Sequence, residues 1–294
     1  MNPQYDHKLI NSFYLWTEDR LARVGSASVT GLSQNFVYSS LGTDVPSNML
    51  AYYSNDRQFL TIGGSNNTEV TGVAIPSGVY IDSVFNEQSY SNSTKVIVDN
   101  YNGRVLVSSN VGVSAAVSGN FPRKEINTYM TQHDEESLLV NEEFIANGES
   151  FLESVTEMGV DRYTVPAVFI TPSTSQNDPF AMGGLDQTKN QVTMVVICSD
   201  YYLLNGTLSL FKDTKNIQFP LLGAFNTPYG GYFDIKEIPY TYTGYTTGQN
   251  DQVFIEKVVT STFKGGGRIN ESLKGKYIGF VDFTLSNVRT PILC

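Results

Sequence analysis

Residues 191–198 (QVTMVVIC) form a nearly continuous apolar run, which is typical of a β-strand covered on both faces. Asp200 follows the run and is a good N-cap residue for a helix. Beyond it, apolar residues recur at spacings of four and three, as Leu204, Leu208 and Phe211. This spacing predicts a helix over residues 201–214. A doubly covered strand followed by an amphipathic helix requires a layered α+β unit, with the helix on one face of a sheet.

The composition of the whole chain favours β structure. Only 16% of its 294 residues are charged, while it contains 25 glycines, 18 tyrosines and 17 phenylalanines. Short strands joined by polar turns need such a composition, whereas a helical bundle needs Ala, Glu, Lys and Leu. The chain is also too apolar and aromatic to remain disordered. We therefore expect a mainly β protein with α+β character: an N-terminal helix and a β-sandwich, followed by an α+β domain.

Three patterns define the expected units of the first half. Apolar residues at helical spacing from Leu9 to Val24, with Gly25 after them, predict a helix within residues 1–26. Six or more short β-rich runs in residues 27–124, with turn signals roughly every ten residues, predict a β-sandwich domain. Within it, residues 99–103 (DNYNG) lie between KVIV and RVLV, which predicts a β-hairpin with an Asn-Gly turn.

The second half is expected to contain an acidic connector over residues 125–162 and an α+β domain over residues 163–294. In this domain, Pro166 places a strand near a sheet edge or at a strand start. Further expectations are a strand at residues 126–131, a short helix or turn at residues 134–136, a long polar loop at residues 171–188, strands at residues 253–263 and 277–285, and a bulge at Gly279.

No local pattern in the sequence supports catalysis, a cofactor or a metal ion. His7 and His133 are not at metal-ligand spacing from a cysteine or from each other, and the sequence contains neither a nucleophile elbow nor a Walker loop. Cys198, at the end of the apolar run, is expected to be a core residue. We therefore predict a protein that is not an enzyme, with no catalytic residue, no cofactor and no metal.

Two kinds of charged segment leave alternatives open. Asp134 and Glu142 could serve as the two carboxylates of a glycosidase. Asp134, Glu135 and Glu136 could bind calcium, although adjacent acids in a polar run are usually solvated. Residues 264–268 (KGGGR) could wrap an anion or form a flexible loop between strands.

Charge is distributed unevenly along the chain. Residues 125–161 contain ten acids and no Lys or Arg, while residues 257–289 contain six Lys or Arg and two acids. Opposite patches of this kind suit identical subunits that pack head to tail around a ring, and two solvated faces are the alternative. Tyrosines in residues 225–245 could form a protein interface, a sugar platform or part of a β core. The candidate interface residues are Asp134, Glu135, Glu136, Glu142, Glu143, Lys264, Arg268, Lys274, Lys276, Tyr229, Tyr232 and Tyr242.

We expect neither nucleic-acid specificity nor membrane insertion. No long basic stripe is interleaved with aromatic residues, and no apolar run approaches the roughly 18 residues of a membrane-spanning helix. The N-terminal residues MNPQYDHKLINSF lack a signal-peptide pattern, so the chain is expected to be made in a cytosol.

The order of elements from residue 165 onward resembles a known class of proteins. A strand at residues 165–170, a loop, the strand at residues 191–198, Asp200 and an amphipathic helix through Leu210 are similar to the tail-terminator and neck proteins of tailed bacteriophages. Short segments also resemble virion structural proteins of marine T4-like phages, at residues 9–16, 74–81, 102–105, 179–185 and 281–283.

The resemblance implies a fold, a function and partners. It implies a terminator-like α+β domain and a structural role at the neck or tail end of a virion that is assembled in the host cytoplasm. The implied partners are copies of the same chain in a ring, with a hexamer as one form, and other phage neck, tail-tube or sheath proteins. The alternative is a β-sandwich protein that binds sugars, as an adhesin, or serves as a collar-fibre or decoration protein.

Overall fold

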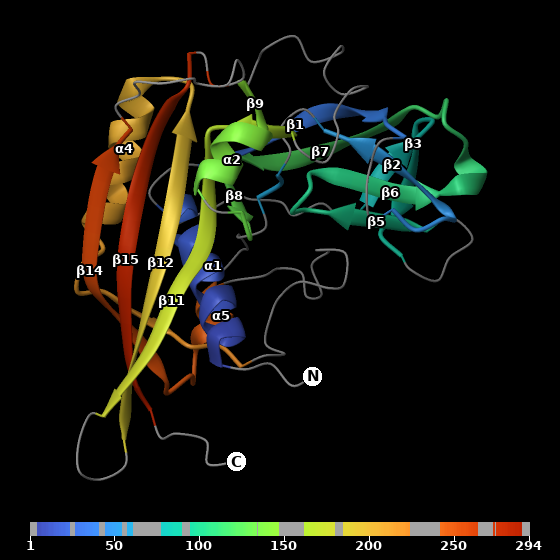
Figure 1. The fold of residues 1–294 in the computed structure, drawn as a ribbon. Helices are drawn as coiled ribbons and strands as arrows, with labels where there is room; N and C mark the ends of the chain where they lie inside the picture. Colours follow the sequence, from blue (N-terminus) through green and yellow to red (C-terminus); the bar gives the residue numbers. More distant parts are fainter. Residues whose placement is uncertain are drawn as a thin grey trace.

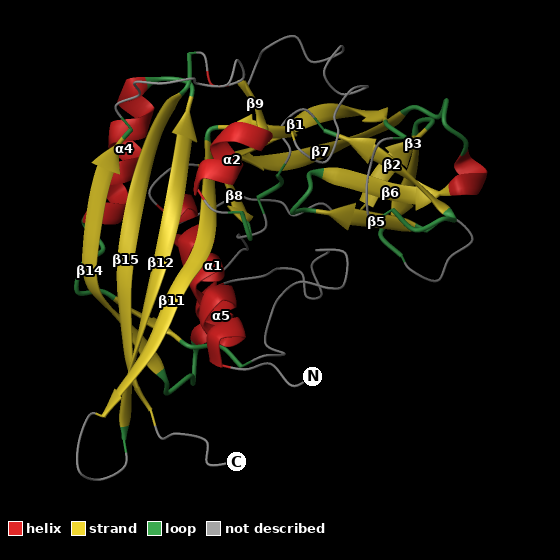
Figure 2. Cartoon of the chain, in the orientation of Figure 1, coloured by secondary structure: helices red, strands yellow, loops and turns green. Residues whose placement is uncertain are grey.

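The chain forms two large β-sheets that lie side by side (Figure 1). The computed structural model describes residues 5–23, 27–40, 45–54, 58–60, 78–89, 95–133, 135–146, 162–179, 185–223, 242–263, 273 and 275–289. Strands dominate these residues and helices flank one of the sheets, so the expected mainly β protein with α+β character is confirmed (Figure 2).

The first sheet has seven strands in the order β4-β3-β7-β1-β2-β6-β5. Their bounds are β1 Ala27–Tyr38, β2 Met49–Tyr53, β3 Gly78–Ile81, β4 Val84–Glu87, β5 Val96–Asp99, β6 Arg104–Ser108 and β7 Val117–Lys124, with the short helix η1 Ser109–Val111 after β6. Strand β1 pairs with β7 along most of its length and with β2 at its end, so a single sheet curls back on itself. Side chains from both halves then share one core, which includes Phe36, Val98, Val107 and Phe121.

The expected hairpin at residues 99–103 is confirmed. Strands β5 and β6 pair antiparallel up to Asp99 and Arg104, and Gly103 has a φ of 59°. Asp99 Oδ2 accepts a hydrogen bond from Arg104 Nε at 2.7 Å, and both side chains are buried. The positive φ explains why the turn needs glycine at this position.

The second sheet has six strands in the order β13-β14-β15-β12-β11-β8, all antiparallel except for the pair β11 and β8. Their bounds are β8 Asn127–Met130, β11 Ala167–Pro179, β12 Asp186–Cys198, β13 Gln218–Pro220, β14 Gln252–Thr262 and β15 Tyr277–Arg289. Helices α1 Tyr5–Arg23 and α4 Tyr201–Lys212 lie on one face of this sheet (Figure 1). The remaining elements are α2 Glu135–Asn141, α5 Tyr242–Thr246 and a parallel pair formed by β9 Glu143–Ala146 and β10 Arg162–Val165.

Helix α1 is part of the core of the six-stranded sheet. The ring of Phe13 lies 5.1 Å from that of Phe283 and 5.8 Å from that of Phe219, and Trp16 stacks on Phe219 at 5.5 Å. Strand β8, which the sequence places in a connector, pairs with β11 in the same sheet. The N-terminal helix and this connector strand therefore pack with the C-terminal α+β unit instead of forming separate units.

The expected polar loop at residues 171–188 is wrong. Strands β11 and β12 form a long antiparallel hairpin, in which Pro179 pairs with Asp186. Residues 171–179 (TPSTSQNDP) lack the apolar alternation that marks a half-buried strand, so the sequence contains no strand signal here. Most of their side chains are exposed in the structure. Pro166 directly precedes β11, which agrees with a strand start. At this end β11 lies between β12 and β8, but β8 pairs with it only from Ala167 to Ile170, so from Pro172 onward no described strand covers its other side.

The helix after the apolar run is confirmed as α4, and Asp200 is its N-cap. Leu203 N donates to Asp200 Oδ1 at 2.7 Å. We expect Asp200→Ala to lower the free energy of unfolding by about 1 kcal/mol in urea denaturation, because the backbone N–H loses its acceptor. Asp200→Ser should remain near the wild-type value, since its hydroxyl can also accept this bond. Equal losses for both variants would contradict the capping role.

The expected bulge at Gly279 is also wrong. Gly279 pairs in register with Val196 of β12 and Thr262 of β14, and the shift in register lies between Ile255 and Lys257. A Cβ atom on Gly279 would lie 2.9 Å from Leu208 Cδ1. The glycine therefore allows α4 to pack closely on β15.

Candidate interaction surfaces

The outer edge of strand β8 is closed by side chains from the seven-stranded sheet and its loops. Gln58 Oε1 accepts a hydrogen bond from Thr128 N at 2.8 Å, and Gln58 Nε2 donates to Thr128 O at 2.7 Å. Two residues further on, Met130 N donates to the hydroxyl of Tyr101 at 2.9 Å. These bonds occupy backbone groups that an added strand would need, so β8 offers no free edge.

A buried ion pair ties α1 to the seven-stranded sheet beside this edge. Lys124 Nζ donates to Glu18 Oε1 and, at 3.1 Å, to Gln58 Oε1. The hydroxyl of Tyr14 donates to Glu18 Oε1 at 2.6 Å. Glu18 and Lys124 are 3% and 5% exposed, so both charges depend on these partners. The network therefore holds the two sheets together, so that the surfaces of both sheets belong to a single unit.

The strand edges left unpaired in the described part of the chain include those of β14 and β4, at the two ends of the molecule. Strand β13 covers β14 only at residues 252–254, and the last bonds along this edge join Ile255 to Asn216 and Ile217. From residue 256 to residue 262, no described residue pairs with the outer edge of β14. Strand β4 likewise pairs only with β3. By contrast, the edge of β5 is bridged by two backbone hydrogen bonds between Ser89 and Val96.

An apolar patch, the hairpin patch, lies on the β3–β4 hairpin and consists of Tyr80, Val84 and Phe85. The rings of Tyr80 and Phe85 are in contact on one face of the hairpin, with their centroids 5.3 Å apart. Val84 is 65% exposed and lies on the other face, opposite Ile81. Asp82 and Ser83 form the turn with φ values of 48° and 70°. This two-residue turn holds the patch at the end of the sheet far from α4 (Figure 1).

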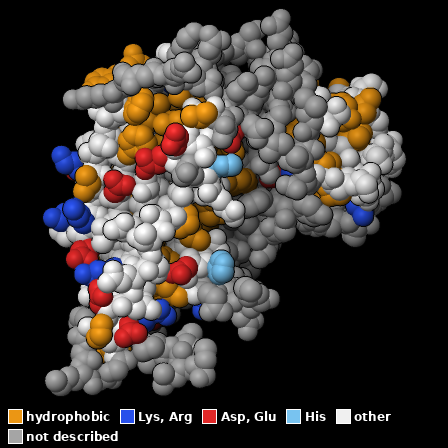
Figure 3. Space-filling view, viewed as in Figure 1, with side chains coloured by type: hydrophobic (Ala, Val, Ile, Leu, Met, Phe, Trp, Pro, Cys, Tyr) orange, Lys and Arg blue, Asp and Glu red, His pale blue; other side chains and the backbone are white. Residues whose placement is uncertain are grey.

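A second patch, the sheet-end patch, lies where β14 and β12 end and where β15 and α4 begin. Its members are the exposed side chains of Tyr201, Tyr202 and Tyr277 on the α4 side of the sheet, and of Val259 and Phe263 on the opposite face, where Phe263 contacts Phe280. Tyr202 is 90% exposed, and the rings of Tyr201 and Tyr277 lie 5.9 Å apart. Figure 3 shows hydrophobic side chains gathered over this end of the six-stranded sheet. The two patches therefore lie at opposite ends of the molecule, each beside an unpaired strand edge.

Most of the interface residues expected from the sequence lie outside the described residues. This holds for Asp134, Lys264, Arg268, Lys274, Tyr229 and Tyr232, and the side chain of Glu143 is also outside them. Residues 264–268, the possible anion loop, lie outside them too. Of the others, Glu135 and Glu136 are exposed in the first turn of α2, and Lys276 is half-buried.

Two of the expected interface residues are buried instead. Glu142 is 3% exposed, and its Oε1 lies 3.7 Å from Nε2 of His133. Tyr242 is 7% exposed in the core beneath α1, and burial raises the pKa of its hydroxyl. Because both side chains are buried, neither can form part of an outer contact in this conformation. The sequence prediction failed here because a run of acids or tyrosines does not reveal which of its members face inward.

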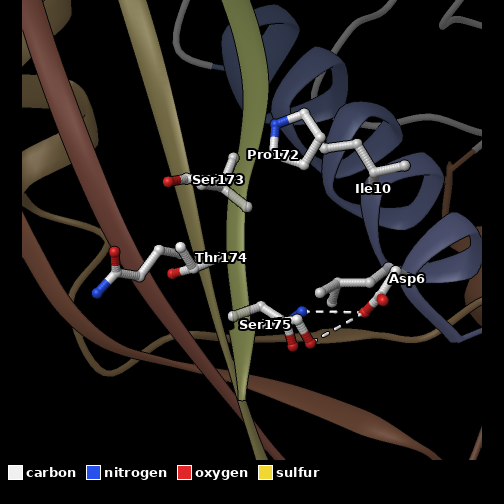
Figure 4. A pocket seen from close by; sticks show the side chains of 10 residues that line it. Asp6, Ile10, Pro172, Ser173, Thr174 and Ser175 are labelled. Carbon is white, nitrogen blue, oxygen red and sulfur yellow. Dashed lines mark hydrogen bonds between the residues drawn. The ribbon is translucent and has the colours of Figure 1, made fainter. Parts of the chain in front are cut away.

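A cavity of about 190 Å³ lies between the first turns of α1 and the β11–β12 hairpin (Figure 4). Asp6 Oδ1 accepts hydrogen bonds from Asn190 Nδ2 at 3.1 Å and from Ser175 Oγ at 3.3 Å. Leu9 and Ile10 contribute apolar lining. The carboxylate thus already fastens the start of α1 to the hairpin.

Cys198 is a buried core residue, as expected, and its thiol is free. Burial, together with the charge of Asp200, raises the pKa of the thiol to about 12. The thiol is therefore protonated at neutral pH and is a poor nucleophile.

The described residues provide neither a metal site nor a membrane-spanning helix. Among them, no group of three or more His, Cys, Asp or Glu side chains could hold a metal ion. No helix within the described ranges is long and apolar enough to cross a membrane.

Comparisons with known proteins do not extend this picture. No protein-family model matches the chain, and a search of the curated proteins found no match. The functional argument therefore depends on the fold and on the two surfaces.

Proposed function

We propose that this chain is a structural subunit that acts by binding other protein chains and catalyses no reaction. Copies of it assemble head to tail into a ring at the neck or tail end of a tailed-phage virion. The observation that carries the proposal is the pair of apolar patches at opposite ends of one molecule, each beside an unpaired strand edge.

Two features that soluble proteins normally avoid support the proposal, namely exposed aromatic patches and free strand edges. Exposed aromatic side chains that gather in a patch mark binding surfaces more often than single exposed ones do. Free strand edges invite pairing with another chain, and proteins usually block them. This chain blocks the edge of β8 with Gln58 and Tyr101 but leaves β4 and β14 open among the described residues. Two different surfaces at opposite ends give a head-to-tail contact, which closes into a ring when the rotation between subunits allows it.

The place in the virion rests on the resemblance of residues 165–210 to tail-terminator and neck proteins. The strand β12, the N-cap Asp200 and helix α4 are the parts that carry this resemblance. In that role the partners beyond the ring are other neck, tail-tube or sheath proteins, and the protein is found in the particle.

Single substitutions in the patches test the binding role. Phe85→Ser and Tyr202→Ser should each weaken self-association by roughly tenfold in dissociation constant, because each removes an exposed aromatic anchor. Size-exclusion chromatography with light scattering over a range of concentrations measures this effect. Val140→Ser is the matched control, since Val140 is 58% exposed on α2 and belongs to neither patch. Equal weakening by the control, or none by the patch variants, would contradict the proposal.

The place in the virion is tested on particles. Mass spectrometry of purified phage particles that carry the gene should detect the chain in a fixed ratio to the other neck and tail proteins. A chain that is abundant in the lysate but absent from the particles would rule out the virion role.

A further inference from the structure

We infer that β4 of one copy pairs antiparallel with the free edge of β14 in the next copy. The seven-stranded sheet of one subunit would then continue the six-stranded sheet of its neighbour. This inference rests on the proposed head-to-tail assembly and names the contact that makes it.

The backbone of β14 shows which residues can bond to an added strand. Phe263 N donates to Ile278 O at 2.9 Å, so the peptide groups of Phe263 point toward β15. Hydrogen-bonding direction alternates along an antiparallel strand, so Ser261 and Val259 also point toward β15. The N–H and C=O groups of Val258, Thr260 and Thr262 therefore point outward from the free edge.

The same argument applies to β4. Ile81 and Val84 flank a two-residue turn and form its closing pair, so the peptide groups of Val84 point toward β3. Because this direction alternates along the strand, the peptide groups of Asn86, two residues further on, also point toward β3. The peptide groups of Phe85 and Glu87 point outward, and no described residue bonds to them. The free edge ends there, because Ser89, the next residue on this side, pairs with Val96 of β5.

These directions limit the register between the two edges. In an antiparallel pair, residues that point outward on one strand must face residues that point outward on the other. One allowed register places Phe85 opposite Thr262 and Glu87 opposite Thr260. It also places Val84 opposite Phe263, whose side chains are 65% and 45% exposed in the single chain. A slip by two residues would instead place Val84 opposite Ser261 and would bury less apolar surface.

The favoured register also joins the two patches. Tyr80 pairs with Phe85, and Thr262 pairs with Gly279, so these four residues would form one continuous row across the joined sheets. The row lies on the α4 side, because a Cβ on Gly279 would point at Leu208 and Leu204 of α4. Pairs of aromatic and β-branched side chains across strands stabilise sheets. The contact therefore sets Tyr80 and Phe85 of one copy on the α4 side of the joined sheets, and Val84 against Phe263 of the next copy on the opposite face.

Disulfide cross-linking tests the contact and its direction. Val84 and Phe263 would form a non-hydrogen-bonded pair, the close type in which a disulfide fits. The variants Val84→Cys and Phe263→Cys are made separately in a chain with Cys294→Ser, and Cys198 is buried and does not compete. After mixing and mild oxidation, we expect at least about ten times more covalent dimer in the mixture than in either variant alone. The double variant should give a ladder of covalent oligomers.

Four outcomes would overturn the inference. Val140→Cys, on exposed α2, is mixed with Phe263→Cys as the control and should give little dimer. Equal cross-linking with this control would show random collision, and equal cross-linking by either single variant alone would show a symmetric contact. An absence of cross-links in a mixture that light scattering shows to be oligomeric would overturn the β4–β14 contact and leave the proposed function standing. A chain that is monomeric throughout would overturn both.

Discussion

Replacing Lys124 with Met is expected to lower the free energy of unfolding by about 3 to 5 kcal/mol, as measured by urea denaturation. The carboxylate of Glu18 is 3% exposed, and Lys124 is its cationic partner in the buried network. Without that partner the carboxylate remains buried with the hydroxyl of Tyr14 but no counter-charge from Lys124. The cost of an unpaired buried charge exceeds the cost of the lost contact itself.

A second substitution separates the charge effect from packing. In the double variant Glu18→Gln with Lys124→Met, the buried charge is gone and the oxygen of the new amide can still accept the bond from Tyr14. We therefore expect the double variant to recover about half of the lost stability. A Lys124→Met variant that unfolds at the wild-type urea concentration would show that the ion pair does not hold the two sheets together.

The second large effect is expected at Gly279. Gly279→Val should destabilise the protein by about 3 kcal/mol in thermal or urea unfolding. The cause is steric, because a Cβ at this position would lie 2.9 Å from Leu208 Cδ1. The side chain of Leu208 is held in the core between α4 and the sheet, together with Leu204. The helix must therefore move outward, and the contact between α4 and β15 weakens.

A compensating substitution tests this cause. Leu208→Ala alone should destabilise the protein, since Leu208 is 6% exposed. Combined with Gly279→Val, it makes room for the added side chain, so the loss in the double variant should be roughly 1 kcal/mol smaller than the sum of the two single losses. Strictly additive losses would mean that the two positions do not compete for the same space.

The elements that could be predicted from the sequence are those whose signals are local. The apolar stripe of α1, the Asn-Gly turn between β5 and β6, and Asp200 before α4 are each encoded within a few neighbouring residues. Periodicity and capping describe such elements well, because the interactions that form them join residues close in the chain.

The junction between the sheets has no local signal. Glu18 and Lys124 lie 106 positions apart, and Gln58 reaches a strand 70 positions away. The nearest hint in the sequence is an acid placed among the apolar residues of α1. Such a residue shows that a buried partner is needed, but it does not identify the partner.

The two surfaces were missed for a different reason. Valine and the aromatic residues are typical of buried strands, so a pattern of Val84 and Phe85 predicts a core rather than a binding surface. Their exposure follows from their position on an edge strand next to a turn, which only the strand order reveals. Candidate interface residues chosen by charge runs and tyrosine content instead included the buried Glu142 and Tyr242.

The central claim is that this chain associates with its own copies through its two ends. Sedimentation velocity of the wild-type chain over a wide range of concentration and salt tests it most directly. We expect a single closed assembly whose mass is an integer multiple of 32.5 kDa and does not grow further as concentration rises. A species of 32.5 kDa at every concentration and every salt level would contradict the claim.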